Sequence, residues 1–97
     1  MANPQFYIYI LSSNKNTTIY IGVTNNLKRR VQEHKEGVGS EFTKKYIVHK
    51  LVYYEEYGSI IEAIKREKRL KNWKRDWKND LINSFNPDWE ELYGKLD

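Results

Sequence analysis

Cysteine is absent from the 97 residues of this chain, which also holds only two histidines, two prolines and five glycines. Without thiols there is no disulfide framework and no thiolate metal site, as is usual in reducing compartments. A zinc site would need mostly carboxylate ligands, which is an unusual donor set. No segment approaches the ~20 consecutive apolar residues that span a membrane. We therefore expect a cytoplasmic protein without membrane association.

Common catalytic signatures are missing as well. There is no glycine-rich phosphate loop of the P-loop or dinucleotide-binding type. There is no G-x-S-x-G turn, and no Ser-His-Asp set can be argued from the sequence. The composition, with 39% hydrophobic and 31% charged residues, is that of a globular protein and excludes a disordered chain. The length predicts a single domain over residues 1–97.

Positive charge is in excess and unevenly distributed. The net charge is +4 and the pI is about 9.2. Nearly all basic residues precede residue 81, whereas residues 81–97 carry four acidic residues and one basic residue. A basic surface of this kind can hold a polyanion such as nucleic acid. A solvated, lysine-rich surface would explain the same charge.

Two short runs rich in aromatic and β-branched residues lie near the start of the chain. Residues 6–11 and 19–23 have this character, and the polar residues 12–17 between them are typical of a turn. The pattern predicts a β-hairpin.

The pairing of the hairpin follows if its strands are symmetric about the loop. Tyr9 then pairs with Tyr20, and Tyr7 pairs with Gly22. Because side chains alternate along a strand, one sheet face is aliphatic and the other carries tyrosines with a gap at the glycine.

The segment after the hairpin has a helical pattern. Asn25 or Asn26 can cap a helix that extends to about Glu36. Gly37 and Gly39 end this helix, as glycines often do at helix C-termini.

Strand and helix patterns continue through the rest of the chain. We expect a short helix at residues 40–46, a strand at residues 50–56 and a long helix at residues 59–78. The apolar stripe of the long helix consists of Ile60, Ala63, Ile64, Leu70, Trp73 and Trp77, with the tryptophan pair in the core. A short acidic helix at about residues 88–94 carries Trp89, Leu92 and Tyr93. The result is an α+β domain in which helices flank a three-stranded sheet, in β-β-α-α-β-α order.

Glu67 is the residue that fits an ordinary core least well. It lies three residues after Ile64 and three before Leu70, which places it on the apolar stripe of the long helix. A carboxylate moved out of water without a partner costs several kcal/mol. A salt bridge to a nearby lysine or arginine would satisfy it. A metal ion would also do so, because hard divalent cations prefer carboxylate oxygens.

Other residues with chemical potential lie on the first helix and the hairpin. Arg30 could clamp a phosphate, or it could be a surface residue of the basic run at positions 28–30. His34 is its neighbour one helical turn later. Tyr9 and Tyr20 share one sheet face, where they could pack or could relay a proton.

Together, these residues resemble the GIY-YIG nuclease family. Its two motifs correspond to YIY at residues 7–9 and YIG at residues 20–22, with Tyr7 in place of the first glycine. An arginine eight residues after the second glycine corresponds to Arg30, and a histidine four residues later corresponds to His34. A helical glutamate before a Leu-Lys pair corresponds to Glu67. The resemblance covers residues 6–82, the expected core, and is greatest to small stand-alone bacterial members.

The resemblance implies a three-stranded antiparallel sheet and a nuclease site similar to that of the excision-repair incision subunit. It implies Tyr9, Tyr20, Arg30, His34 and Glu67 as catalytic residues, with Glu67 binding Mg²⁺ or Mn²⁺. The expected partner is nucleic acid, DNA rather than RNA, in DNA repair or processing. Candidate residues for contacts with its backbone are Lys28, Arg29, Lys44, Lys45 and Lys71.

Two other functions fit the same sequence. A nucleic-acid-binding module that has lost catalysis would keep the basic face and the tyrosines, but it would bind without metal and never cut. A protein-interaction domain could use Trp89, Leu92 and Tyr93, although these residues also suit the core.

Overall fold

The architecture was determined as a computed structural model, which describes residues 5–96. Its elements are β1 (Phe6–Ser12), β2 (Ile19–Thr24), α1 (Leu27–Lys35), α2 (Glu41–Tyr46), β3 (Lys50–Tyr57), α3 (Ile60–Asn72), α4 (Arg75–Phe85) and a 3-10 turn, η1 (Tyr93–Lys95). The sheet is antiparallel, with strand order β2-β1-β3. This confirms the α+β fold with a three-stranded antiparallel sheet between helices.

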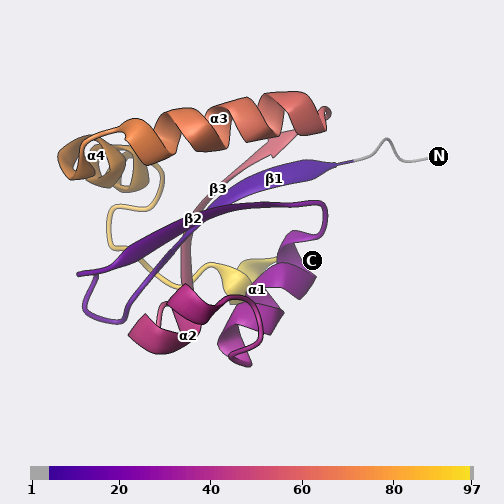
Figure 1. The fold of residues 1–97 in the computed structure, drawn as a ribbon. Coiled ribbons are helices and arrows are strands. Elements are labelled where there is room, and N and C mark those ends of the chain that lie inside the picture. Colours follow the sequence, from indigo (N-terminus) through magenta and orange to yellow (C-terminus); the bar gives the residue numbers. More distant parts are fainter. Residues whose placement is uncertain (1–4, 97) are drawn as a thin grey trace.

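The two faces of the sheet are covered by different helices (Figure 1). On one face, Ile8, Ile10 and Ile21 pack with residues of α3 and α4, including the fully buried Leu70. On the other face, Tyr9 and residues of β1 and β3 pack with α1 and the C-terminal segment. Alternation along β1 therefore divides its side chains between two separate cores.

The register of the hairpin differs from the symmetric pairing expected above. Tyr9 pairs with Gly22, and Leu11 pairs with Tyr20. The pairing is shifted by two residues because the turn centres later, where Asn16 takes a positive φ of 60°. Its amide donates to the carbonyl of Ser13. A shift of two residues keeps every side chain on its expected face, so the tyrosine face and its gap remain.

The expected long helix at residues 59–78 is two helices. Trp73 and Lys74 take extended ψ values of 151° and 152°, which end α3 at Asn72 and turn the chain into α4. Only two members of the expected stripe are buried, Ala63 and Leu70. The expected core pair of tryptophans was also wrong in part: Trp73 is half-buried and touches Trp77 edge-on, but Trp77 is 53% exposed.

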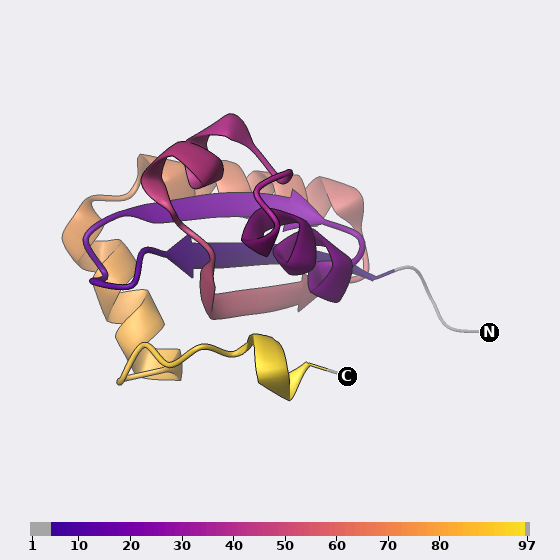
Figure 2. The ribbon, with the colours of Figure 1, turned by 90° about the horizontal axis from the view of Figure 1, so that it is seen from below.

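The C-terminal segment forms no helix at residues 88–94, contrary to expectation. Trp89 has a φ of 51°, which interrupts any helix, and only residues 93–95 form the 3-10 turn. The Glu91 carboxylate instead accepts a hydrogen bond from the backbone N–H of Leu51, and the Leu92 N–H donates to the Leu51 carbonyl. The segment thus lies along β3, as Figure 2 shows, and leaves β2 at the opposite edge of the sheet.

Trp89 and Leu92 are each only 9% exposed. They belong to the cores on opposite faces of the sheet, so the core interpretation is confirmed for these two residues, whereas Tyr93 is only partly buried against the second core. Within residues 5–96, no helix combines the length and the apolar character needed to cross a membrane.

Candidate active site

A chain of buried hydrogen bonds connects β1, α1 and α2. The Tyr9 hydroxyl lies 2.9 Å from His34 Nε2, and His34 Nδ1 lies 2.8 Å from the Thr43 hydroxyl. Thr43 in turn donates to the backbone carbonyl of Ser40. If Tyr9 donates to Nε2, the remaining His34 proton is on Nδ1 and donates to Thr43, so every group is satisfied.

Two glycines leave space for the rings of Tyr9 and His34. A Cβ atom on Gly22 would lie 2.5 Å from Cζ of Tyr9, and one on Gly39 would lie 2.6 Å from Cγ of His34. Both distances are far below van der Waals contact, so any side chain at these positions would displace the ring. The expected gap on the tyrosine face is therefore filled by Tyr9 itself, across the pair with Gly22.

His34 lies 2% exposed in the core of this face. A histidine on a helix usually faces solvent, but this ring is enclosed by the protein. The role expected of Gly39 also changes: Gly37, with a φ of 81°, ends α1, whereas Gly39 packs against the histidine ring.

Burial and nearby charges determine the protonation states of Tyr9 and His34. Burial raises the pKa of the Tyr9 phenol to about 12, although the nearby guanidinium of Arg30 acts against this. Burial and, to a smaller extent, the positive charge of Arg30 together lower the pKa of His34 to about 4. At neutral pH Tyr9 therefore holds its proton and the His34 ring is neutral, so the ring can accept a hydrogen bond from the phenol.

The Arg30 side chain lies beside these hydrogen-bonded residues and is itself held by hydrogen bonds, so it does not extend freely into solvent. Its Nη2 donates to the Gly39 carbonyl at 2.8 Å, and Nη1 donates to the Glu33 carboxylate at 3.2 Å. The side chain is 32% exposed. A guanidinium held in this way can still present its remaining N–H groups to an anion.

Tyr20 lies beside the chain on the neighbouring strand. Its ring centroid is 6.3 Å from that of Tyr9 and 5.4 Å from that of His34. The structure therefore brings together Tyr9, Tyr20, Arg30 and His34, which the sequence had singled out.

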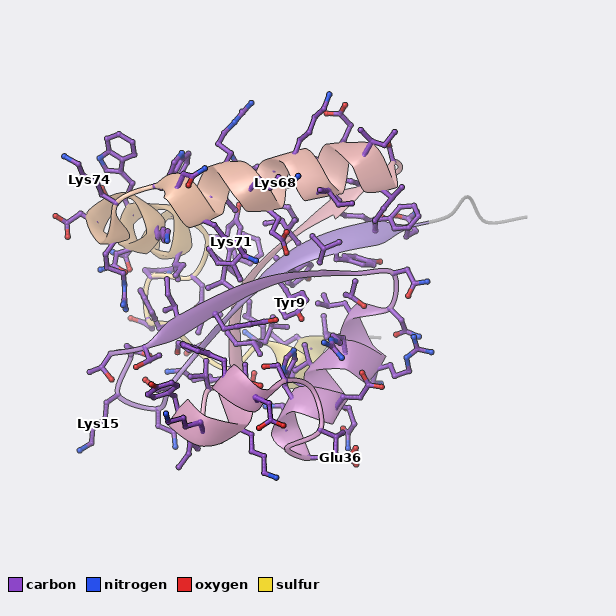
Figure 3. The ribbon with its side chains drawn as sticks, in the orientation of Figure 1. Tyr9, Lys15, Glu36, Lys68, Lys71 and Lys74 are labelled. Atoms are coloured by element: carbon purple, nitrogen blue, oxygen red, sulfur yellow. The ribbon has the colours of Figure 1, made fainter. Side chains whose placement is uncertain are left out.

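Glu67 approaches from the other face of the sheet. It is on α3, its side chain is 19% exposed, and its carboxylate lies 3.5 Å from Lys71 Nζ. Its negative charge nevertheless acts on Tyr9, contributing to the raised pKa of the phenol. Figure 3 shows Tyr9 and Lys71 on opposite sides of β2. Lys71, the ion-pair partner of Glu67, therefore lies across β2 from Tyr9.

Within residues 5–96, no three His, Asp or Glu side chains gather into a metal site. Glu67 supplies a single carboxylate, and Lys71 pairs with it. Mg²⁺ usually keeps several waters and binds one or two carboxylates together with substrate phosphates. The donor set therefore fits a divalent cation whose coordination is completed by a bound phosphate, rather than an ion held by the free protein.

The basic residues expected to contact a nucleic-acid backbone are all exposed, namely Lys28, Arg29, Lys44, Lys45 and Lys71. Lys45 extends over the ring of Tyr46, 5.4 Å from its centroid. Lys71 lines a shallow groove along β2. Their contacts with nucleic acid remain a prediction.

Three residues of the site were missed in the sequence: Gly39, Thr43 and Phe42. Thr43 and Gly39 act on His34 through the loop and helix that follow α1, and no local pattern indicates such a contact. Phe42 packs its ring 5.9 Å from that of Tyr20. The one signal in the sequence that could have pointed to Phe42 is the presence of an aromatic residue in a short polar helix.

Comparisons with known proteins identify the family of this domain. A family model described as the GIY-YIG catalytic domain matches residues 5–80. A UPF0213 protein of Clostridium perfringens is 40% identical over 78 residues, covering 80% of this chain and 83% of its own. One from Natronomonas pharaonis is 37% identical over 76 residues, covering 78% and 88%.

A solved structure is similar as well. The solution NMR structure of a UPF0213 protein from Bacillus halodurans superimposes with a TM-score of 0.58 and 27% sequence identity, covering 91% of this chain and 93% of that one. The family match extends over most of the chain and includes both tyrosine motifs, Arg30, His34 and Glu67. This chain belongs to the GIY-YIG family of nuclease domains.

Proposed function

We propose that the protein is a metal-dependent endonuclease that hydrolyses phosphodiester bonds of DNA, in repair or processing. The observation that carries this proposal is the buried Tyr9–His34–Thr43 chain beside Arg30, with Glu67 near enough for its charge to raise the pKa of the Tyr9 phenol. Membership of the nuclease family supports it.

The hydrogen-bonded chain suits the activation of water. As a water attacks phosphorus, its proton passes to the Tyr9 hydroxyl while the phenolic proton passes to Nε2 of His34. Proton count is conserved, and His34 ends as the cation. A bound phosphate would favour that cation, because nearby negative charge raises the pKa of an imidazole. Thr43 holds the ring in the orientation that presents Nε2 to the phenol.

Arg30 and Glu67 would act on the phosphate from the two sides of β2. Arg30 donates hydrogen bonds to a phosphoryl oxygen as charge develops there. Glu67 would hold a divalent cation, which would supply stabilisation of the negative charge on the phosphoryl and leaving oxygens. Lys71 must release the Glu67 carboxylate for this to occur, and a phosphate offers the ammonium another partner.

The test is cleavage of labelled DNA in Mg²⁺ or Mn²⁺, with EDTA as the blank. Arg30→Ala and Glu67→Ala should each reduce the cleavage rate by at least about a hundredfold, the effect of removing one transition-state donor. Arg69→Ala and Glu62→Ala are matched controls, since both residues are exposed on α3 away from the site. Circular dichroism should show all four variants folded.

Two results would contradict the proposal. If Arg30→Ala and Glu67→Ala cleave at the normal rate, the site is wrongly assigned. If the protein binds DNA equally well in EDTA and cleaves nothing under any metal condition, it is instead a nucleic-acid-binding module that keeps the fold.

A further inference from the structure

A row of aromatic rings extends from the candidate active site to the surface. Tyr20 lies 5.4 Å from His34, Phe42 lies 5.9 Å from Tyr20, and Tyr46 lies 4.8 Å from Phe42, measured between ring centroids. The two outer rings are largely open to solvent, with Phe42 41% and Tyr46 48% exposed. An exposed aromatic pair contributes little to a core, so its exposure calls for another explanation.

A groove of about 290 Å³ runs beside this row along β2. It is lined by Ile19, Tyr20, Ile21, Phe42, Lys71 and Lys78. Its floor is apolar, and its charged lining residues are both lysines. No carboxylate lines it, so the groove favours a ligand with a flat apolar part and a negative charge.

Lys78 is held in an unfavourable position for a cation. Burial lowers its pKa, as does the positive charge of Arg75. Its Nζ donates to the Lys71 carbonyl at 3.3 Å, and within residues 5–96 no carboxylate lies within ion-pair distance of it. An anion in the groove would relieve this, because a nearby negative charge favours the ammonium form.

We propose that the aromatic row and the groove bind an unpaired nucleotide of the nucleic-acid strand. Its base stacks on Phe42 and Tyr46, and its phosphate lies between Lys71 and Lys78. This inference rests on the proposed function in one respect: the nucleotide is adjacent to the phosphodiester that is cut. The substrate class is therefore single-stranded nucleic acid, or a duplex that carries unpaired bases next to the cut.

The geometry favours an unpaired base over a paired one. A base inside a duplex is stacked on both sides, so it has no free face for an aromatic ring. The groove also lies along β2, on whose opposite sides Tyr9 and Lys71 lie in Figure 3. A nucleic-acid strand that crosses β2 brings its next nucleotide to the aromatic row.

Binding and cleavage are measured separately, so that the two proposals can fail independently. Fluorescence anisotropy in EDTA follows binding of the full chain to three labelled probes: a single strand, a blunt hairpin duplex, and the same hairpin with a single-stranded arm. DNA and RNA versions of each probe determine which sugar is accepted. We expect the single strand and the armed hairpin to bind at least about tenfold more tightly than the blunt hairpin.

Variants then locate the binding. Phe42→Ala should weaken binding to single strands by about tenfold and leave the blunt hairpin within about twofold, as loss of one stacked base predicts. Phe42→Tyr should restore it. Lys78→Gln should reduce the dependence of single-strand affinity on salt by about one phosphate contact. Ile61→Ala, at an apolar residue 62% exposed on α3, is the matched control and should change nothing.

A direct readout comes from Phe42→Trp. Its added indole emission should be quenched by single strands and not by the blunt hairpin. The inference is wrong if single strands bind no better than the blunt hairpin, or if Phe42→Ala weakens both probes equally. Loss of self-association in Phe42→Ala, measured by sedimentation, would also overturn it and make the row an interface between copies.

The cleavage assay separates this inference from the proposed function. Selective single-strand binding without any cleavage in Mg²⁺ or Mn²⁺ supports the nucleotide site and contradicts the nuclease. Cleavage confined to fully paired DNA, unaffected by Phe42→Ala, supports the nuclease and contradicts the nucleotide site.

Discussion

Polar groups packed between β3 and α3 and polar groups near the edge of β2 differ in how completely they are paired. On the α3 side, Glu55 is enclosed: Arg66 donates to both of its oxygens at 3.0 Å, and two tyrosine hydroxyls also donate to it. On the other side, Arg30 and the Tyr9–His34 pair keep capacity for a ligand. Glu67, although it lies on the α3 side, also does so near the edge of β2, since among residues 5–96 only the half-exposed Lys71 pairs with it.

This difference separates stability from chemistry within one small domain. A carboxylate that already accepts four hydrogen bonds can gain little from a substrate, whereas a carboxylate with one mobile partner can exchange it. The apolar face therefore stabilises the sheet. At the edge of β2, by contrast, side chains can exchange their present hydrogen-bond or ion-pair partners for a ligand. Variants on the two sides should show different balances of lost stability and lost activity.

The largest effect is expected from Leu70→Ala on the apolar face. Leu70 is fully buried against the sheet, and deleting its side chain should lower the free energy of unfolding by about 2–5 kcal/mol. Urea denaturation measures this loss. Cleavage per folded molecule, measured well below the denaturation midpoint, should be unchanged. A large loss of activity in fully folded protein would contradict the idea that this face contributes to stability and not to activity.

The next largest effect is expected from acid. The pKa of His34 is about 4 in the folded protein, whereas an unperturbed histidine has a pKa of 6.5. The unfolded protein therefore takes up a proton at a higher pH than the folded protein does. Stability should therefore be complete above pH 6.5 and decline towards pH 4, by about 3 kcal/mol.

The matched variant for this pH effect is His34→Gln, which cannot titrate. Urea midpoints at intervals between pH 7 and pH 4 should converge for the two proteins as the wild type loses its advantage. Parallel curves would mean that His34 is not buried as a neutral ring.

A moderate loss of stability with a large loss of activity is expected from Gly22→Ala. The new methyl would overlap the Tyr9 ring, and overpacking of this kind costs about 1–3 kcal/mol. Displacement of Tyr9 should reduce cleavage far more than the stability loss explains. Ile10→Val, at a fully buried residue of the apolar face, should give a similar loss of stability with normal cleavage.

A smaller effect is expected from Thr43→Val, which keeps the shape and removes the hydroxyl that receives the His34 proton. Stability should fall by about 1 kcal/mol, with a shift in the pH profile of cleavage because the imidazole loses its orientation. Thr43→Ser should restore the profile. Identical profiles for all three proteins would remove Thr43 from the chain.

The smallest effect is expected from Lys71→Ala. The ion pair with Glu67 joins a side chain that is 52% exposed, so its contribution to stability is below about 1 kcal/mol. Release of Glu67 should instead lower the metal concentration needed for half-maximal cleavage. An unchanged metal dependence would show that Lys71 does not compete for the carboxylate.

The sequence predicted the fold well where the signal was local. Asn26 caps α1 and Ser59 caps α3 through side-chain hydrogen bonds to the backbone, as their residue types indicate. The strands also followed their aromatic and β-branched runs. The hairpin register was wrong because the centre of a polar loop has no strong signal, and a shift of two residues preserves the pattern of faces.

Features that depend on distant contacts could not be predicted. No glycine or proline marks the break at Trp73 and Lys74, so the helical pattern of residues 59–78 was continuous in sequence. His34 is buried by residues of α2 and by Tyr9 of β1, which helical periodicity does not reveal. The roles of Tyr9, Tyr20, Arg30, His34 and Glu67 stay predictions until the variants are assayed.

The filling of the space above Gly22 by Tyr9 has a consequence for how this domain can evolve. Positions 9 and 22 share one fixed volume, as do positions 34 and 39. A larger residue at either glycine is tolerated only if its aromatic partner shrinks in the same lineage. Among related sequences, side-chain size at each pair should therefore covary inversely, and a change at one position alone should mark a copy that has abandoned the site.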